Sequence, residues 1–76
     1  MDKILFEELK DEIKSIKYTL DNLDFDIVDI KVAIHNIKKL GINTKELDSQ
    51  IDDIGIEIYQ FKNKLRTFEI LSKNLM

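Results

Sequence analysis

Cysteine, proline and tryptophan are absent from the sequence, which also has only two glycines and one histidine. Without cysteine the chain can form no disulfide bond and no thiolate zinc site, and it has no cysteine nucleophile. Two glycines leave few loops that could form a pocket, and there is no glycine-rich phosphate-binding loop. The composition thus argues against several common kinds of active site.

The remaining candidates for chemistry are one histidine and several groups of acidic residues. A metal site on a helix needs a second ligand three or four residues from His35, where the sequence has only lysine and valine. Asp24, Asp26 and Asp52 belong to acidic groups that we expect on solvated helix faces, where two carboxylates do not acquire different pKa values. We therefore expect no enzyme, no catalytic residue, no metal site and no cofactor.

Long apolar runs are also missing, since none exceeds three residues. A membrane span needs about 20 apolar residues and a secretory signal core about 7 or more. We therefore expect a cytoplasmic protein with no membrane-spanning segment.

Neither half of the chain is basic. The first 40 residues have seven lysines and nine acidic residues, and the other 36 have five basic and six acidic residues. Nucleic-acid binding requires a basic stripe that displaces counterions. A nucleic-acid-binding hairpin dimer is therefore the weakest of the functions that we consider.

Large apolar residues recur at alternating steps of three and four in two segments. This spacing is that of heptad positions a and d, which keep one stripe of a helix facing a partner. The first segment contains Phe6, Leu9, Ile13, Ile16, Leu20, Leu23, Ile27, Ile30, Ile34 and Ile37, and the second contains Leu47, Ile51, Ile54, Ile58, Phe61, Leu65, Phe68 and Leu75. Only Ser72 interrupts the second series. We expect these 18 apolar residues to form the association core.

The two segments are separated by signals for the end of one helix and the start of another. Gly41 follows two lysines and suits the left-handed residue that terminates a helix. Asn43, followed by Glu46, is a candidate N-cap, and Thr44 is the alternative cap. The sequence therefore predicts one domain over residues 1–76, with helices at about 2–40 and 44–75 joined by a turn at 41–43. A continuous helix through Gly41 is the alternative.

Two stretches also resemble β-strands. Residues 23–34 and 54–58 alternate apolar and polar side chains and are rich in β-branched residues. The three-four spacing nevertheless runs through both without a change of register. We therefore predict an all-α protein rather than strands.

The charges favour an antiparallel return of the second helix. A turn near residue 42 brings Lys62 level with Asp21 and Asp24, and Lys31 level with the acidic start of the second helix. Exposed ion pairs contribute only about 0–1 kcal/mol each, so they would set the register rather than drive folding. The predicted fold is an antiparallel helical hairpin.

A hairpin of 76 residues has too little core to be stable without help. Small domains use disulfides, metals or association, and only association is open to this chain. Isoleucine at both a and d favours assemblies of more than two helices. We therefore expect a homodimer or higher oligomer, with a four-helix bundle as the simplest form.

A second set of apolar residues lies outside the heptad stripe. It comprises Ile4, Tyr18, Phe25, Val28, Val32, Ile56, Tyr59 and Ile70. Polar residues normally occupy such positions. We expect this candidate second interface to contact either another copy or a foreign protein.

Two functions follow from these expectations. The first is a non-catalytic coiled-coil protein that mediates protein–protein association, as a self-assembling, scaffold or adaptor element. The alternative is a small phage- or mobile-element-encoded regulator that binds a host protein through Tyr18, Phe25, Val28 and Val32.

Overall fold

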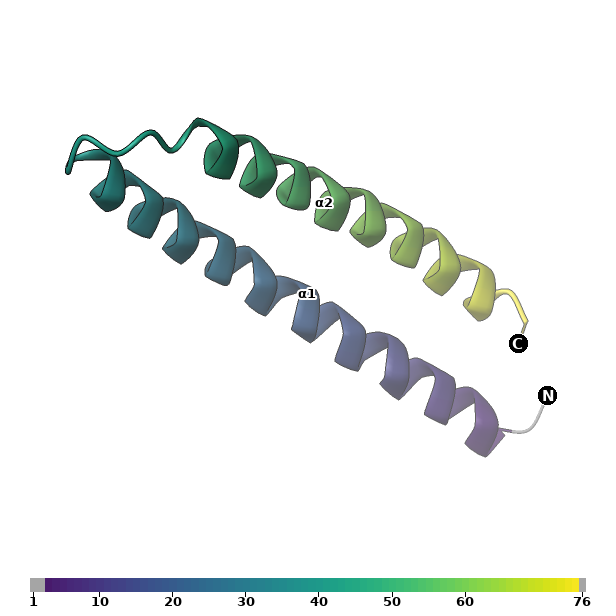
Figure 1. The fold of residues 1–76 in the computed structure, drawn as a ribbon. Coiled ribbons are helices and arrows are strands. Elements are labelled where there is room, and N and C mark those ends of the chain that lie inside the picture. Colours follow the sequence, from purple (N-terminus) through teal and green to yellow (C-terminus); the bar gives the residue numbers. More distant parts are fainter. Residues whose placement is uncertain (1–2, 76) are drawn as a thin grey trace.

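A computed structural model describes residues 3–75 and shows two antiparallel helices that lie side by side (Figure 1). Helix α1 spans Lys3–Lys38 and helix α2 spans Lys45–Lys73. Residues 23–34 and 54–58 are helical, and the described part of the chain contains no strand. The prediction of an all-α hairpin is therefore confirmed, because the heptad spacing outweighs the local preference of β-branched residues for strands.

The helix limits differ slightly from the prediction. Helix α1 ends at Lys38 rather than at about 40, and α2 covers Lys45–Lys73 rather than about 44–75. Residue 2, at the predicted start of the first helix, lies outside the described residues, as do residues 1 and 76. Differences of one or two residues are ordinary at helix ends, where the last turn loosens.

Gly41 reverses the chain as the sequence predicts. Its φ of +83° is in the left-handed region, and its N–H donates to the carbonyl of Lys38 at 3.0 Å. The N–H of Leu40 donates to the carbonyl of Ile37 at the same distance. These bonds satisfy carbonyl groups that the end of α1 would otherwise leave unpaired. A continuous helix through Gly41 is thereby excluded.

The start of α2 uses both residues that the sequence offers as caps. Thr44 is the N-cap residue, but its hydroxyl donates to the Asp48 carboxylate at 3.3 Å rather than accepting from the backbone. The Asn43 side-chain oxygen instead accepts from the N–H of Lys45 at 3.0 Å. The Thr44 side chain is buried, with 3% of its surface exposed.

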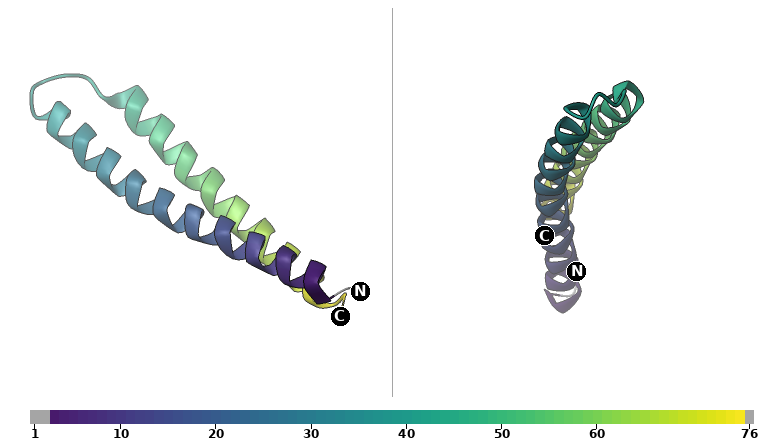
Figure 2. Two further views of the ribbon diagram at one scale, coloured as in Figure 1. Left: turned by 90° about the horizontal axis from the view of Figure 1, so that it is seen from below. Right: turned by 60° about the vertical axis from the view of Figure 1, so that its left-hand side comes forward.

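The hairpin is a thin rod and not a compact domain. It measures 59 × 16 × 10 Å, and its radius of gyration of 17.7 Å compares with about 11 Å for a compact chain of this length. In Figure 2, α2 lies beside α1 near the turn and crosses it near the two termini, so the helices wind around each other. A rod of two helices leaves much of each helix in water.

The two glycines provide a matched test of the turn. An alanine Cβ would meet no atom within 4 Å at either position, but only Gly41 has a positive φ. We expect Gly41→Ala to lower the free energy of unfolding by about 1–2 kcal/mol, because alanine is strained in the left-handed region. Gly55→Ala should raise it by about 1 kcal/mol, because Gly55 lies inside α2. Urea denaturation followed by circular dichroism measures both changes, and equal effects of the two substitutions would contradict the turn geometry.

Candidate functional site

The two helices bury one apolar column from each, which we call the seam. On α1 its members recur every seven residues: Phe6, Ile13, Leu20 and Ile34 are buried, and Ile27 is half-buried. On α2 it consists of Thr44, Ile51, Leu65 and Ser72, which are buried, and Ile58, which is half-buried. Ile13, Leu20 and Leu65 form a cluster against which Leu9 and Ile58 pack. The seam therefore contains the interior of the single hairpin.

The rest of the expected association core remains partly exposed to water. Three residues after each seam residue comes a second large apolar residue, and we call these two rows the open columns. They contain Leu9, Ile16, Leu23, Ile30 and Ile37 on α1, and Leu47, Ile54, Phe61, Phe68 and Leu75 on α2 or just beyond its end. Leu9 is half-buried, and the other nine expose between 37% and 62% of their surface. The structure thus brings together only one of the two columns that the heptad pattern marks on each helix.

Helix geometry puts both open columns on the same side of the hairpin. A step of three residues turns about 300°, which is about 60° short of a full turn. On two helices that face each other and run in opposite directions, this offset is toward the same side of the plane that contains both axes. The ten side chains of the open columns therefore form one continuous surface, which we call the apolar face.

The opposite side of the seam is covered by charged residues. Lys17 of α1 forms an ion pair with Glu69 of α2, and Lys62 of α2 pairs with Asp24 and, at 3.3 Å, with Asp21 of α1. Nearer the turn, Lys31 lies 3.3 Å from Asp52. We call this surface the ion-pair side. The hairpin thus has one polar side and one apolar side, as expected if only the apolar side were to be buried.

Most of these ion pairs join residues that were expected to lie at the same height along the hairpin. One pair was not predicted from the sequence. Lys62 and Lys31 pair with carboxylates that were expected at their height. Lys73 forms an ion pair with Glu69 on its own helix, at 3.6 Å. Lys17 and Glu69 were not paired from the sequence, although the same antiparallel register places them level with each other.

Two groups on the ion-pair side have altered proton affinities. The hydrogen bond from Lys17 is the main reason that the pKa of Glu69 lies below its ordinary value of 4.5, and partial desolvation opposes it. The hydrogen bond to Asp24 is the main cause of the rise in the pKa of Lys62 above 10.5, again against desolvation. Both shifts favour the charged forms, which hold the helices in register.

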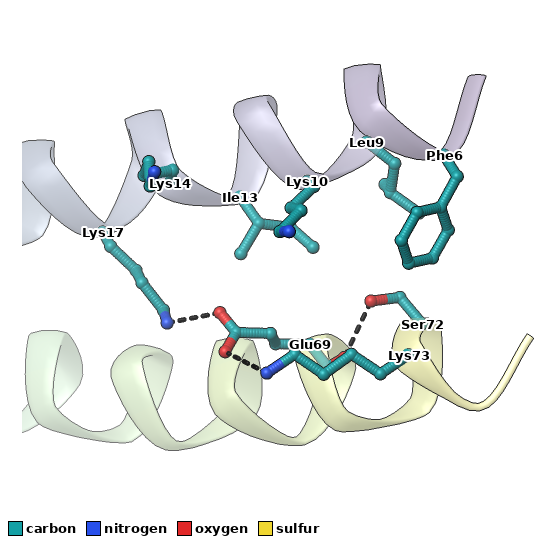
Figure 3. Close-up of a pocket in the computed structure, with 9 residues that line it drawn as sticks. All are labelled: Phe6, Leu9, Lys10, Ile13, Lys14, Lys17, Glu69, Ser72 and Lys73. Carbon is teal, nitrogen blue, oxygen red and sulfur yellow. Dashed lines mark hydrogen bonds and ion pairs between the residues drawn. The ribbon is translucent and has the colours of Figure 1, made fainter. Parts of the chain in front are cut away.

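A groove opens at the end of the seam where Ser72 replaces a large apolar residue (Figure 3). Its volume is about 520 Å³, and its apolar wall consists of Phe6, Leu9 and Ile13. The Ser72 hydroxyl donates to the carbonyl of Glu69 at 2.7 Å, so it brings no unpaired polar atom into the groove. Four lysines line the groove together with Glu69: Lys10, Lys14, Lys17 and Lys73. The groove is the result of the small side chain at position 72.

The residues of the candidate second interface are all exposed, by 54% to 72% of their surface. Tyr18, Phe25 and Val32 follow one another along the outer edge of α1 at intervals of seven residues, and Ile4 lies two such intervals before Tyr18. Ile56 and Ile70 occupy the outer edge of α2, whereas Val28 and Tyr59 lie nearer the ion-pair side. Because the outer edges of the two helices point in opposite directions, the eight residues do not form one surface.

The described residues contain neither a metal-ligand group nor a membrane-spanning helix. Within residues 3–75, no three His, Asp or Glu side chains are grouped so that they could hold a metal ion, and His35 is exposed. In the same range, neither helix is both long enough and apolar enough to cross a membrane. The apolar face is therefore the feature on which a function is most readily built.

Two features of this site were not predicted from the sequence. Thr44 was considered only as a cap, although it lies seven residues before Ile51 and is the first buried member of the seam on α2. The unequal burial of the two columns was also not foreseen, because the heptad pattern marks both columns alike. The available signal for Thr44 was the recurrence of seam residues every seven positions from Ser72 back to Thr44.

Comparisons with protein-family models, curated proteins and solved structures return no match to the chain.

The ion pairs predict how stability depends on pH. The pKa of Glu69 is lower in the folded than in the unfolded chain, so its stabilising effect is present above pH 4.5 and is lost as the pH falls through the folded value. We expect the melting temperature of the parent protein to fall more between neutral pH and about pH 3 than that of Glu69→Gln. Asp29→Asn, at an exposed position outside these ion pairs, serves as the control and should retain the steeper fall. Equal acid sensitivity of the parent and Glu69→Gln would contradict the role of the Lys17–Glu69 pair.

Proposed function

We propose that this protein is a non-catalytic association module whose apolar face packs against the same face of a second copy to form a four-helix bundle. The biochemical activity would be self-assembly, with a scaffold or adaptor role for the bundle. The observation that supports this most directly is the apolar face, in which nine of ten large apolar side chains are more than one-third exposed.

The total surface supports the same conclusion. The hairpin exposes 6378 Å² at a mass of 9.0 kDa, whereas a compact monomer of this mass exposes about 4,900 Å². A standard protein interface buries about 800 Å² on each partner. The excess surface of one hairpin is therefore enough to supply such an interface, and the rod of 59 × 16 Å offers a face of that size.

The energetics favour burial of this face. Apolar surface that leaves water contributes about 25 cal/mol per Å², so an apolar interface of standard size offsets the cost of association. Contiguous apolar patches of this extent are rare on proteins that remain monomeric. Association would also supply the core that a chain this short needs for stability.

A second candidate function is the regulator that binds a host protein through the outer edge of α1. It is favoured by the exposure of Tyr18 and Phe25, which are 70% and 72% exposed. Aromatic side chains of this kind often act as interface hot spots. Nucleic-acid binding has less support, because Lys17, Lys31 and Lys62 form ion pairs with carboxylates of the hairpin itself.

A pair of aspartate substitutions tests the proposed function. Ile30 lies in an open column and is 45% exposed, whereas Val32 lies on the outer edge of the same helix and is 55% exposed. Size-exclusion chromatography with light scattering should give a dimer for the parent and for Val32→Asp. We expect Ile30→Asp to raise the dissociation constant more than about 100-fold, because an unpaired buried charge costs about 3–5 kcal/mol.

Three results would contradict the proposal. One is a parent protein that has the mass of a single chain at tens of micromolar concentration. Another is an Ile30→Asp variant that remains as dimeric as Val32→Asp. The third is a dimer that withstands Ile30→Asp but dissociates with Phe25→Glu, which would assign the contact to the outer edge of α1.

A further inference from the structure

The apolar face permits two symmetric dimers, and the residues beside it distinguish between them. This inference rests on the proposed function. A two-fold axis that lies in the interface can run along the helices, which places both turns at the same end and packs α1 against α2 of the other copy. It can instead run across the helices, which places the turns at opposite ends and packs α1 against α1 and α2 against α2. Both dimers are closed by symmetry.

The open columns fit both dimers equally well. Leu20 of α1 and Leu65 of α2 belong to one buried cluster and lie level with each other. Because the helices are antiparallel, any residue of α1 lies level with the residue of α2 for which the two residue numbers add to 85. Leu23 and Phe61 are level by this rule to within one residue. With the turns at the same end, Leu23 lies on the partner's Phe61. With the turns at opposite ends, Leu23 lies on the partner's Leu23, and Phe61 on the partner's Phe61. In either dimer, every other residue of the open columns also lies level with an open-column residue of the partner.

A further column borders the apolar face on each helix and is not equally suited to both dimers. We call it the flanking column. Each of its members lies four residues before or three residues after a residue of an open column. It contains Leu5, Glu12, Thr19, Asp26, Ala33 and Leu40 along α1 and the start of the turn, and Gln50, Glu57, Lys64 and Leu71 on α2. All ten residues are exposed in the single hairpin, so each would meet its counterpart only in a dimer.

With the turns at the same end, the flanking columns clash. Asp26 lies within two residues of the level of the partner's Glu57, and the symmetry creates this pair of like charges twice. Leu71, which is 60% exposed, lies within two residues of the level of the partner's Glu12. Leu5 lies beyond the end of the partner's α2 at Lys73 and meets no residue of its flanking column. Like charges beside an interface oppose association and disfavour this arrangement.

With the turns at opposite ends, the flanking columns are complementary. Glu57 lies within one residue of the level of the partner's Lys64, so the symmetry forms two pairs of opposite charge. Leu5 lies level with the partner's Leu40, and these residues, 57% and 76% exposed, would cover each other. Asp26 lies level with the partner's Thr19 and carries no like charge opposite it.

We therefore propose that two copies associate through their apolar faces with their turns at opposite ends, about a two-fold axis that passes the layer of Leu23 and Phe61. The partner that completes the bundle is a second copy of this chain in an antiparallel orientation. Each end of the bundle then carries one turn and one pair of chain termini.

Distances between spin labels test this orientation. The chain has no cysteine, so single cysteines can be introduced and labelled with a nitroxide. Lys39 is exposed beside the turn and outside the apolar face. With the turns at opposite ends, two labels on Lys39→Cys are separated by about 48 Å along the bundle, because each residue advances 1.5 Å. With the turns at the same end they are separated only by the width of the bundle, below about 30 Å.

A second label position separates failure of the orientation from failure of the dimer. Asn22 is exposed and lies next to the layer of the proposed axis, so Asn22→Cys should give a distance below about 30 Å in either dimer. A long distance from Lys39→Cys with a short one from Asn22→Cys supports the proposal. Short distances from both overturn the orientation but leave the dimer intact, and no interchain distance from either overturns the proposed function itself.

Charge reversal gives an independent test in which the two dimers predict opposite signs. In the proposed dimer, Glu57→Lys and Lys64→Glu each replace two opposite-charge pairs by like-charge pairs. Each should raise the dissociation constant by about 3- to 10-fold at low salt, and the double variant should restore it, as expected for exposed pairs. In the same-end dimer, Glu57→Lys would remove the clash with Asp26 and tighten association. A tighter Glu57→Lys dimer would therefore overturn the proposal.

Discussion

Everything in this structure depends on how much apolar surface one helix can bury against a single neighbour. Each helix carries two apolar columns, but a lone partner helix covers only the one that faces it. In the hairpin that column is the seam, and Leu20 and Leu65 are buried while Ile30 and Phe61 remain about half exposed. Burial of apolar area is the main driving force of folding, so the exposed part of the open columns is apolar surface whose burial could still add stability.

Charged residues cover one side of the seam and leave the other open. Ion pairs of Lys17, Lys31 and Lys62 lie on one side of the seam. Individually such pairs contribute little, but long charged side chains also shield the apolar groups beneath them from water. The other side has no such cover over its ten open-column residues, so the two sides of the hairpin differ in polarity.

The ends of the seam show a different constraint. On α2 the column begins with Thr44 and finishes with Ser72, so its buried polar residues lie at the two ends and its apolar residues lie between them. Each hydroxyl has a local acceptor, in Asp48 and in the backbone of Glu69. A buried hydroxyl is tolerated when it is hydrogen-bonded. The cost is in packing, because Ser72 is too small to fill its layer and leaves the groove beside Phe6.

Much of the fold could be predicted because heptad spacing is a long-range signal. Ten successive apolar positions on α1 outweigh the β-branched stretch of residues 23–34, and Gly41 marks the turn because its positive φ is costly for other residues. The position of the turn alone predicts that Lys62 lies level with Asp21 and Asp24, with which it forms ion pairs. The site was harder to predict, because spacing identifies both columns of a stripe but not which of them faces the partner within the chain.

What distinguishes the two columns is the rotation of each helix about its own axis. In the observed rotation the seam column faces inward, and Lys17 and Glu69, outside the apolar stripe, form an ion pair across the two helices. The proposed four-helix bundle has a similar division of roles. The open columns would bring the apolar faces together, but their layers match in both symmetric arrangements and so do not select one of them. The flanking columns would therefore specify the orientation, since residues such as Glu57, Lys64 and Asp26 meet different residues in the two arrangements. In the proposed dimer, apolar residues would provide the driving force for association, and the charged residues beside them would determine its geometry.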